Sequence, residues 1–517
     1  MRWGWQDLPS ESKLTAAIFD STIESDNAGT KTNAPHVVES YEQGESRCET
    51  SLPLVVDLDG TLVSTDVMVE SCFILAKKSL LEFFRLALWL CRNPARLKQR
   101  LASEAMPDVH TLPYRRDFLD YLVSEKQSGR KLFLATAADQ AVAHEVADEV
   151  GLFDAVFASD GTINLNGDRK RDRLVKEFGL KGFDYAGNGT RDRSVWEAAR
   201  KKILVHPTLG LRAVLKKGIP FDRTFEYEPG NWRIYLQALR PSQWLKNALV
   251  FLPLVAVHQL YDFAMLAHAS LAFVVLSLCA SSVYLLNDLT DLEEDRRHAQ
   301  KKSRVLASGK LPVTHAVSLI PMLLLVAIAI SLRQPPLFSI ISAYCVLMLA
   351  YCLKLRSFAG WDVLALATGY SLRVTAGSVA EGIFVSRWLL GSIFLLFFGL
   401  ALLKRYAELV ARRKAGQTTG RVRGYTIEGS KRIAAWGCLS SYLGLLVFGY
   451  YLATQNHRYV TYEPMWLFAV LLVFWITHIW LNAERGEIDG DPVKFVLGDR
   501  LSRVLGVLMV ATLLAAA

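Results

Sequence analysis

The chain has 517 residues, of which 51% are hydrophobic and 21% are charged, and its formal net charge at pH 7 is +9. These values, with a mean hydropathy of +0.22, suit a chain that is part soluble and part membrane-embedded, and the length suggests about two to four domains. The lysines and arginines cluster between apolar runs, which favours membrane orientation and argues against nucleic-acid binding.

The first 50 residues show no signal-peptide pattern, and the cysteines show no disulfide pattern. Residues 1–50 are rich in Ser, Thr, Glu and Asn and lack an apolar core of signal-peptide length, so we predict a disordered leader. The seven cysteines follow neither CxxC nor metal-ligand spacing. We therefore expect reduced thiols and no disulfide framework.

An apolar run from Leu52 to Val56 predicts a buried strand that delivers Asp57 and Asp59. One carboxylate at a strand end can attack phosphorus and form an aspartyl-phosphate, and a second can protonate the leaving oxygen and later activate water. The pattern DxDGT resembles the first motif of the haloacid dehalogenase-like (HAD) superfamily. The resemblance implies an α/β, Rossmann-type phosphatase domain.

Further HAD-like motifs follow in order. The strand-like KLFLAT ends in Thr136, which matches the motif whose hydroxyl binds the phosphoryl group. Lys170 is the best match to the phosphate-stabilising lysine, with Lys176 as the alternative. FDYAGNGTRD resembles the metal-binding motif but has Asn188 where an acid is usual, so we expect weaker Mg²⁺ binding. The metal ligands implied by the resemblance are Asp57, Asn188 and Asp192. The alternative is a catalytically inactive HAD domain.

Residues 66–112 mix helix-spaced apolar positions with basic residues and are too interrupted to span a bilayer. We predict a helical cap inserted in the HAD core, with contact to anionic lipid as the alternative. Ile203 to Pro207 is predicted to be the last strand. The predicted organisation is a leader (1–50), a HAD-like domain (51–215), a linker (216–232) and a membrane domain (233–517).

The membrane domain is predicted to be all-α and polytopic, with about nine transmembrane helices. The apolar runs lie at 244–257, 265–287, 313–332, 336–353, 361–380, 388–403, 433–453, 464–481 and 500–517. The connections 288–312, 404–432 and 482–503 are rich in Lys and Arg, so the positive-inside bias places them and the amino-terminal domain in the cytoplasm. We expect a bacterial inner-membrane protein with both sites on the cytoplasmic side. A transporter is disfavoured, because the polar residues gather at the helix ends.

The stretch LLNDLTDLEEDRRH, from Leu285 to His298, places acids at the end of an apolar run. If the helix continues, Asn287, Asp291 and Asp295 share one face, with Asp288 beside them. Crowded carboxylates favour a divalent cation, and Mg²⁺ prefers a few carboxylates together with substrate phosphate oxygens. The stretch predicts a Mg²⁺-diphosphate site, and solvent-facing acids at a polar helix end are the alternative.

The motif NDxxDxxxD after an apolar helix resembles the first aspartate-rich motif of the UbiA superfamily of intramembrane prenyltransferases. LRPSQWLKN (Leu239 to Asn247) and HAQKKSRVLASG (His298 to Gly309) are similar to the segments that flank this motif, with Val305 where a proline is usual. Together these resemblances cover roughly residues 233–517.

The UbiA superfamily usually has a second aspartate-rich motif, DxxxD, at a later cytoplasmic helix end, and this chain lacks it there. It reads LLKRYAELVARRK instead, from Leu402 to Lys414, which resembles the decaprenyl-phosphate phosphoribosyltransferase branch. In that branch the diphosphate belongs to phosphoribosyl pyrophosphate (PRPP), and a polyprenyl phosphate is the acceptor. More cations suit a substrate with an additional phosphate, because arginine binds phosphate oxygens bidentately.

The resemblance implies Mg²⁺-dependent attack of the polyprenyl phosphate on C1 of ribose as the diphosphate leaves. The residues implied to hold the metal and diphosphate are Asn287, Asp288, Asp291 and Asp295. The further substrate-binding residues are Lys246, Asn247, Lys301, Arg304, Lys354, Asp362, Arg373, Lys404, Arg405, Glu408 and Tyr425. Taken singly, each basic residue is better explained as a positive-inside marker, and only the set at one membrane face argues for substrate binding.

These patterns lead to the hypothesis of a bifunctional enzyme that uses PRPP and polyprenyl phosphate at the membrane. The HAD domain would remove the 5-phosphate and leave polyprenyl-phosphoryl-ribose, a precursor of lipid-linked pentose donors. Two alternatives stay open: an aromatic or quinone prenyltransferase that uses prenyl diphosphate, and a carrier with a degenerate HAD scaffold. A homo-oligomer is possible, and no nucleic-acid partner is expected.

Overall fold

The computed structural model describes residues 52–78, 94–208, 211, 220–225, 232–257, 259, 261–414, 416, 421–422, 424–454, 463–488 and 492–516. The predicted leader and most of the predicted linker lie outside these residues. The described residues form two compact units: the first comprises those up to Tyr235 together with Asp288–Ala316, and the second comprises those of Leu236–Asn287 and Val317–Ala517. We call Asp288–Ala316 the connecting segment. It therefore folds with the first unit, although helices of the second unit precede and follow it in sequence.

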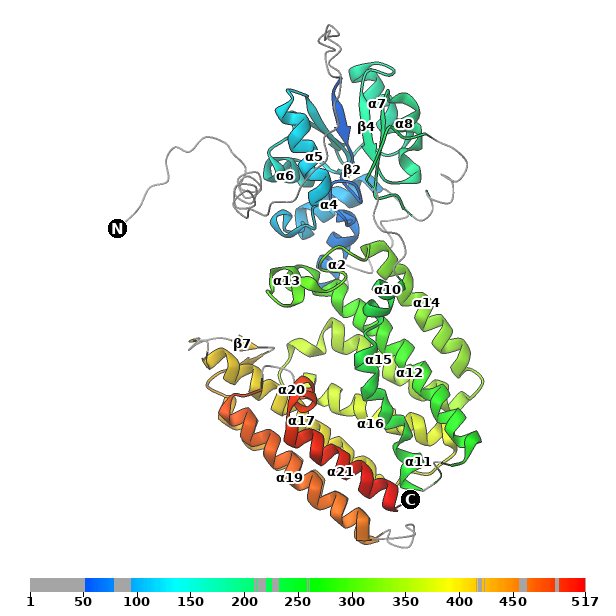
Figure 1. Cartoon of the computed structure of the whole chain (residues 1–517), viewed down its shortest axis with the longest axis vertical. Coiled ribbons are helices and arrows are strands. Elements are labelled where there is room, and N and C mark those ends of the chain that lie inside the picture. The colour runs from blue at the N-terminus through cyan, green and yellow to red at the C-terminus, as the bar shows by residue number, and fades with distance from the viewer. Residues whose placement is uncertain are drawn as a thin grey trace, which may run out of the picture. The chain divides into compact units, whose positions relative to one another are not determined.

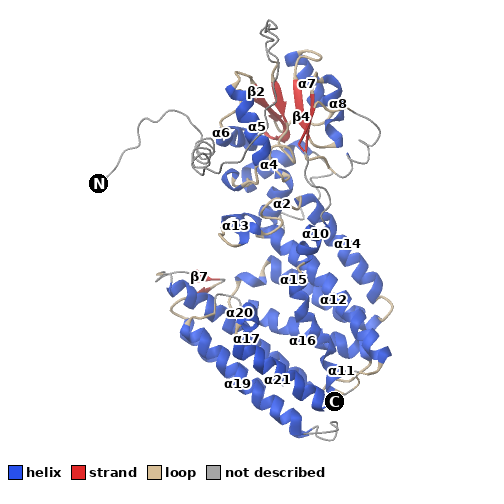
Figure 2. Ribbon diagram, viewed as in Figure 1, coloured by secondary structure: helices blue, strands red, loops and turns tan. Residues whose placement is uncertain are grey.

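A six-stranded parallel sheet in the order β3-β2-β1-β4-β5-β6 forms the centre of the first unit (Figure 2). Its strands are β1 (Leu54–Val56), β2 (Leu132–Asp139), β3 (Ala155–Ser159), β4 (Asp184–Gly187), β5 (Lys202–Val205) and β6 (Arg223–Phe225). In β1, Val56 pairs with Leu134 of β2 on one side and with Ala186 of β4 on the other. The strand order reverses between β1 and β4, and open parallel sheets bind ligands at the carboxyl ends of such strands. The predicted α/β class is confirmed.

The prediction that Ile203 to Pro207 ends the sheet is wrong. Strand β6 pairs in parallel with β5 and lies within the stretch predicted as a linker. Its three residues have no apolar run to announce a strand, and only Phe225 is partly buried, where its ring contacts Phe118 and Tyr121 at centroid distances of 5.3 Å. Packing against the first unit therefore decides this strand, and the local sequence does not.

Helices cover both faces of the sheet. They are α2 (Val67–Lys78), α4 (Pro94–Ala105), α5 (Arg116–Gln127), α6 (Gln140–Val150), α7 (Asp168–Phe178) and α8 (Arg193–Ala198), with the 3-10 turns η1 (Val109–Thr111) and η2 (Thr190–Asp192). Successive residues of β1 point to opposite faces, so Val56 packs with Phe118, whereas Val55 packs with Tyr185. Helices α2 and α4, in the region predicted to be a cap, pack on each other through a small apolar cluster that includes Leu75 and Leu101.

The connecting segment contains α13 (Leu292–Arg297) and η4 (Lys301–Ser303). The expectation of one continuous helix through the acidic stretch is wrong: α12 (Phe263–Thr290) ends before Asp291, and α13 starts after it. Asp291 has φ −104° and ψ 10°, and its carbonyl accepts a hydrogen bond from the backbone N–H of Asp295 at 2.8 Å. The acids therefore do not share one helical face, and the fold of the segment determines which of them meet.

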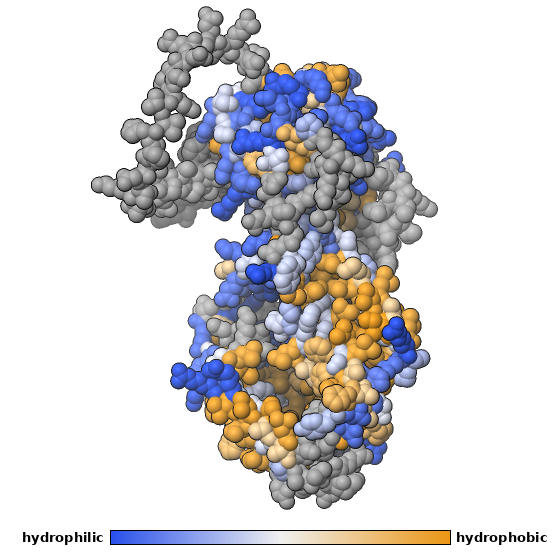
Figure 3. Space-filling model, turned by 45° about the vertical axis from the view of Figure 1, so that its right-hand side comes forward, coloured by the Kyte–Doolittle hydropathy of each residue, from blue (hydrophilic) through white to orange (hydrophobic). Residues whose placement is uncertain are grey.

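The second unit is helical. Besides α12 it contains α14 (Val313–Ser331), α15 (Pro335–Leu353), α16 (Trp361–Glu381), α17 (Arg387–Lys414), α18 (Ser430–Thr454), α19 (Glu463–Arg485), α20 (Pro492–Gly498) and α21 (Arg500–Ala516) (Figure 1). Among the described residues, seven helices are long and apolar enough to cross a membrane. Hydrophobic residues cover much of the visible face of this unit (Figure 3). The predicted all-α membrane domain is confirmed as a class.

Two of the nine expected spans differ from the rest. The first forms the 3-10 helix η3 (Pro241–Phe251) and the five-residue α11 (Leu252–Ala256), because Pro253 cannot continue the hydrogen-bond ladder and starts a new helix. The last, α21, has 17 residues. A third difference concerns α17, which continues to Lys414, beyond the predicted end at 403, because KRYAELVARRK consists largely of good helix formers.

Short helices and strands lie before and between the long helices of the second unit. They are α10 (Trp232–Leu239), which begins in the first unit, the 3-10 turn η5 (Leu355–Ser357), and the antiparallel pair β7 (Arg421–Val422) and β8 (Tyr425–Thr426). Helix α16 packs directly on η3. A Cβ atom on Gly377 of α16 would lie 1.9 Å from the carbonyl oxygen of Val250, so the absence of a side chain permits this contact. The contact brings Asn247 of η3 beside α16.

Candidate active sites

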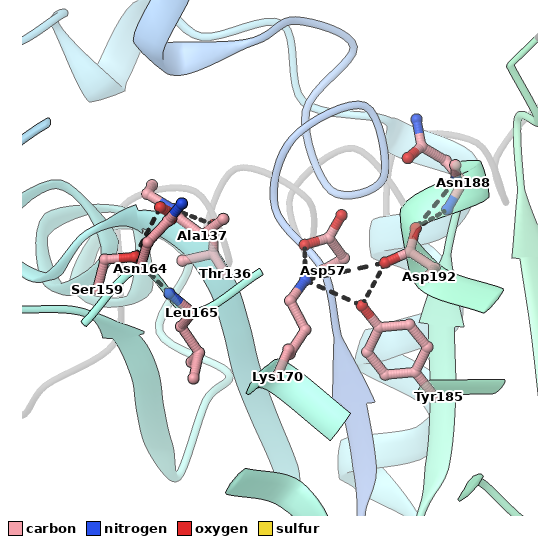
Figure 4. Close-up of polar contacts among 12 residues, drawn as sticks. Asp57, Thr136, Ala137, Ser159, Asn164, Leu165, Lys170, Tyr185, Asn188 and Asp192 are labelled. Atoms are coloured by element: carbon pink, nitrogen blue, oxygen red, sulfur yellow. Dashed lines mark hydrogen bonds and ion pairs between the residues drawn. The ribbon is translucent and has the colours of Figure 1, made fainter. Parts of the chain in front are cut away.

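Asp57 directly follows β1 and is the centre of a polar cluster in the first unit (Figure 4). The Nζ atom of Lys170, on α7, donates hydrogen bonds to Asp57 Oδ1 at 2.7 Å and to the hydroxyl of Tyr185 at 3.1 Å. Tyr185, on β4, donates in turn to Asp192 Oδ1 at 2.8 Å. Lys170 is 3% exposed, whereas the alternative Lys176 is exposed on α7. The fold thus brings Lys170, and not Lys176, to the predicted nucleophile.

Burial controls the ionisation of this cluster. It raises the pKa of Asp57 to about 6, against the opposing effect of Lys170. The pKa of Lys170 is also raised, because burial, which favours the neutral amine, is outweighed by the charges of Asp57 and Asp192. Burial raises the pKa of Asp59 well above its usual value, and the Asp66 carboxylate adds to the rise. The site therefore places a lysine cation against Asp57 and favours a protonated Asp59.

Asn188 and Asp192 lie at the end of β4, on the same edge of the sheet as Asp57. Asp192 Oδ2 accepts hydrogen bonds from the backbone N–H groups of Asn188 at 3.1 Å and Gly189 at 2.9 Å. Asn188 packs against the loop that carries Asp59: a Cβ on Gly60, whose φ is +75°, would lie 2.0 Å from Asn188 Nδ2. This loop therefore needs glycine at position 60.

The donor set suits a hard cation. Asp57, Asn188 and Asp192 all line one cavity, and Mg²⁺ takes oxygen ligands while keeping waters and substrate oxygens. Across the described residues no three His, Cys, Asp or Glu side chains form a preformed metal cluster. The predicted ligands fit Mg²⁺ in chemical type.

The cavity has a volume of about 560 Å³ and also receives residues that sequence reasoning missed. Lys98, from α4, donates from Nζ to the carbonyl of Ala137 at 2.6 Å and to Asn164 Oδ1 at 2.9 Å. No local motif marks Lys98, and Tyr185 was visible only as part of FDYAGNGTRD. The hydroxyl of Thr136 is fully buried and accepts from the backbone N–H of Ala138 at 3.0 Å, so Ala137 and Ala138, and not Thr136, line the cavity.

The acids of the connecting segment are held by cations. Asp288 and Asp295 are 5% and 2% exposed, and Nη1 of Arg304 donates to Asp288 Oδ1 at 3.4 Å and to Asp295 Oδ2. Two carboxylates thus converge on one guanidinium nitrogen, a geometry that a divalent cation also suits. Lys301 Nζ lies 3.9 Å from Asp295 Oδ1. Asp291 is directed elsewhere, 3.7 Å from Nζ of Lys77 on α2.

Arg405 is the centre of a buried hydrogen-bond network in the second unit. Arg405 Nε donates to Asp362 Oδ2 at 2.6 Å, and its Nη1 donates to Glu408 Oε2 at 2.7 Å. Tyr425 donates to Asp362 Oδ1 at 2.6 Å and accepts from the backbone N–H of Gly360 at 2.7 Å. Asp362 and Arg405 are 0% and 1% exposed. Four residues predicted from sequence therefore meet, but the two carboxylates already neutralise the guanidinium.

Arg373, on α16, has different surroundings. Its guanidinium donates to Asn247 Oδ1, the carbonyl of Gly369 and the hydroxyl of Tyr344, each at 2.8 Å. Asn247 is fixed by a hydrogen bond to Ser277 Oγ at 3.0 Å. Every acceptor that contacts Arg373 is neutral. The predicted pair Asn247 and Arg373 is thus brought together as a buried cation with neutral ligands.

The remaining predicted residues of the second unit are Lys246, Asn287, Lys354 and Lys404. Asn287 Oδ1 accepts from Arg356 Nη1 at 2.7 Å, an arginine that sequence reasoning missed. Lys246 donates to Gln243 Oε1 at 2.6 Å. Lys354 is exposed just after α15, and Lys404 is half-buried on α17. The substrate contacts predicted for these lysines stay predictions.

Comparisons with known proteins agree with the two-part organisation. The profile of the UbiA prenyltransferase family matches residues 248–498. "Uncharacterized protein y4nM" of Sinorhizobium fredii is 33% identical over 466 residues, which are 89% of this chain and 90% of that protein. A match of this length includes parts of both halves.

Two further proteins resemble the helical half. "Decaprenyl-phosphate phosphoribosyltransferase" of Mycolicibacterium smegmatis is 34% identical over 296 residues, which are 54% of this chain and 91% of that protein. A solved UbiA homolog from Archaeoglobus fulgidus, bound to GPP and Mg²⁺, is 17% identical with a TM-score of 0.42 and covers 54% of this chain and 99% of that one. The family profile, the relative from Mycolicibacterium smegmatis and the seven long apolar helices among the described residues together identify a multi-pass membrane protein. The chain belongs to the UbiA prenyltransferase family, and an α/β unit with HAD-like motifs precedes its family region.

Proposed function

We propose that the chain is a bifunctional membrane enzyme. Its membrane domain transfers the 5-phosphoribosyl group of PRPP to a polyprenyl phosphate, and its HAD-like domain removes the 5-phosphate to give polyprenyl-phosphoryl-ribose. The observation that carries the proposal is the presence, in one compact unit, of the Asp57–Lys170 cluster and the connecting segment with Asp288 and Asp295. The first reaction produces a phosphate monoester, which is the substrate class of the second.

The connecting segment supplies the diphosphate end of the transfer. Asp288 and Asp295 share the guanidinium of Arg304, and Lys301 lies beside Asp295, so that both cations can neutralise the leaving diphosphate. Asp288 and Asp295 would hold Mg²⁺, which would supply Lewis-acid stabilisation of the diphosphate. The C1–O bond to the diphosphate breaks with its electron pair, and an oxygen of the anionic polyprenyl phosphate bonds to C1. No proton has to be removed from the acceptor, so this step needs no general base.

Arg373 is the best candidate in the second unit for binding a substrate phosphate. A buried cation is costly unless an anion compensates it, and the acceptors that contact Arg373 are neutral. Arg405 is already compensated by Asp362 and Glu408, which supports a positioning role. In this assignment Arg405 and Asp362 hold Tyr425 and the turn at Gly360, and Arg373 with Asn247 receives the anion.

The phosphatase step uses the residues at the carboxyl end of β1. The Asp57 carboxylate attacks the 5-phosphorus, and the bond from phosphorus to the ribose oxygen breaks while Asp59 protonates that oxygen. Asp59 then takes a proton from water, which hydrolyses the aspartyl-phosphate and releases inorganic phosphate. Lys170 neutralises the phosphoryl charge throughout, and Tyr185 keeps Lys170 and Asp192 aligned. Asp57, Asn188 and Asp192 would hold Mg²⁺, which offsets the phosphate charge.

The family also includes enzymes that use prenyl diphosphate, so the competing reading is an aromatic or quinone prenyltransferase. Membranes that contain the chain are incubated with ribose-labelled PRPP and polyprenyl phosphate, or with labelled prenyl diphosphate and an aromatic acid. Lipid-soluble label in the first mixture supports the proposal. Transfer in the second mixture alone supports the prenyltransferase, and transfer in neither supports a carrier with a degenerate HAD scaffold. The proposal places both sites on the cytoplasmic face of a bacterial inner membrane.

A further inference from the structure

The phosphatase cavity has a second wall that the reaction does not use. Besides the residues around Asp57, the cavity is lined by Gly309–His315 of the connecting segment and by Ile234 and Tyr235, all in the first unit, and we call these residues the second wall. Ligand cavities of about 300–1,000 Å³ hold whole small molecules, so a volume of about 560 Å³ exceeds what a single phosphate group needs. The second wall therefore faces the rest of the substrate.

Ion pairs hold this wall in place. Arg296 forms a two-pronged contact with Glu70 of α2, with Nη1 to Oε2 at 2.9 Å and Nη2 to Oε1 at 2.6 Å, and both side chains are buried. Fork-to-fork arginine–carboxylate pairs fix geometry as well as charge. Glu70 also accepts a hydrogen bond from Thr65, which lines the cavity. The Arg296–Glu70 pair, which we call the anchor, is thus hydrogen-bonded to the loop that follows Asp59.

The backbone of the connecting segment makes a close approach to the same loop. Gly309 has φ +71°, and a Cβ there would lie 1.9 Å from Ser64 Oγ and 3.0 Å from Pro113 Cβ. Ser64 lines the cavity as well. Only glycine combines this backbone conformation with this contact. The connecting segment therefore packs closely against the phosphatase loop that contains Ser64.

The groups on the second wall are suited to an anion. Lys310 supplies a cation, and the rings of His315 and Tyr235 stack with their Nδ1 and hydroxyl 3.0 Å apart. We propose that the connecting segment is the cap of the phosphatase and that Lys310 binds a second anionic group of its substrate. If the proposed function holds, this group is the phosphodiester on C1 of the ribose whose 5-phosphate meets Asp57. The cap itself does not depend on that identity.

The test compares ribose 1,5-bisphosphate with ribose 5-phosphate as substrates of the full-length chain in detergent, with 5-phosphate release as the readout. The wild type is expected to prefer the bisphosphate in kcat/KM. Lys310→Ala should reduce this preference about tenfold, as the loss of one charge-assisted hydrogen bond predicts, through KM and with kcat on ribose 5-phosphate unchanged. Lys310→Arg should retain most of the preference. The matched control is Lys302→Ala, an exposed lysine of η4 that does not line the cavity.

A wild type without preference for the bisphosphate overturns the proposal, as does a Lys310→Ala variant that loses the same factor on both substrates. A second variant, Arg296→Ala, removes the anchor and should also lower the preference while the turnover of ribose 5-phosphate persists; an unchanged preference contradicts the cap. A separate assay uses phosphoribosyl polyprenyl lipid. Failure to dephosphorylate this lipid, with the bisphosphate preference intact, refutes the proposed function and leaves the cap standing.

Discussion

Each unit contains a buried ion pair of similar length. Asp57 and Lys170 are 2.7 Å apart in the first unit, and Asp362 and Arg405 are 2.6 Å apart in the second. The first pair lines a cavity, and its carboxylate is 8% exposed. The second pair is sealed, and Glu408 and Tyr425 complete its hydrogen bonds.

The difference separates chemistry from architecture. A charge that borders a cavity can exchange its partner for a substrate, whereas a charge whose partners are complete contributes to the geometry around it. Sequence patterns alone predicted Asp57 as a nucleophile and Arg405 as one of a set of substrate-binding residues. By this criterion Asp57 belongs to a reaction site, whereas Arg405 stabilises the structure of the second unit, and four substitutions test the distinction.

The largest effect is expected for Asp57→Asn. Removing the nucleophile should lower 5-phosphate release by at least about 1,000-fold, because asparagine cannot form the acyl-phosphate. Transfer from PRPP should persist, so the 5-phosphorylated lipid accumulates in labelled membranes. Asp172→Asn, an exposed acid on α7, is the control. Retained phosphate release, or loss of both activities together, contradicts the assignment.

Next in size is Asp288→Ala. The variant removes one of the two carboxylates that contact Arg304 and leaves only that of Asp295. Transfer from PRPP should fall about 100-fold, because stabilisation of the diphosphate is lost. Hydrolysis of ribose 5-phosphate should change little. Glu293→Gln, which removes an acid of the same segment that pairs with Arg297, serves as the control. Unchanged lipid labelling in Asp288→Ala would place the diphosphate site elsewhere.

Arg405→Ala tests the sealed pair. Breaking it leaves Asp362 buried without its cation, which typically costs about 3–5 kcal/mol of stability. We expect a clear fall in the midpoint of thermal unfolding in detergent, and none for Arg412→Ala, an exposed arginine on the same helix. If Arg405→Ala keeps its stability and loses only phosphoribosyl transfer, Arg405 binds substrate and the comparison between the two pairs breaks down.

The smallest effect is expected for Tyr185→Phe. The substitution removes the hydrogen bonds to Lys170 and Asp192 but keeps the ring, and one bond to a charged group is worth about 1.5 kcal/mol. The rate of ribose 5-phosphate hydrolysis should therefore drop about tenfold. Tyr121→Phe, in the core on the other face of the sheet, is the matched change. Equal rates in wild type and Tyr185→Phe would show that Lys170 needs no alignment.

Some features could be predicted because contiguous residues specify them. The run before Asp57 specifies a strand that ends in a carboxylate, and the long apolar runs specify the membrane helices. Motif order also singled out Lys170, which the fold carries to Asp57. Lys98 and Arg356 were not predicted, because each reaches its partner from an element that carries no functional motif.

By itself, the sequence determined the two fold classes, the order of the parts and the residues with chemical potential, since local periodicity and short motifs encode these. Only the tertiary structure decided which charges meet. Arg296 and Glu70 are 226 positions apart, and Arg405 and Asp362 are 43 apart. Burial, and the partners that satisfy a buried charge, arise from packing between distant segments, which no local pattern contains.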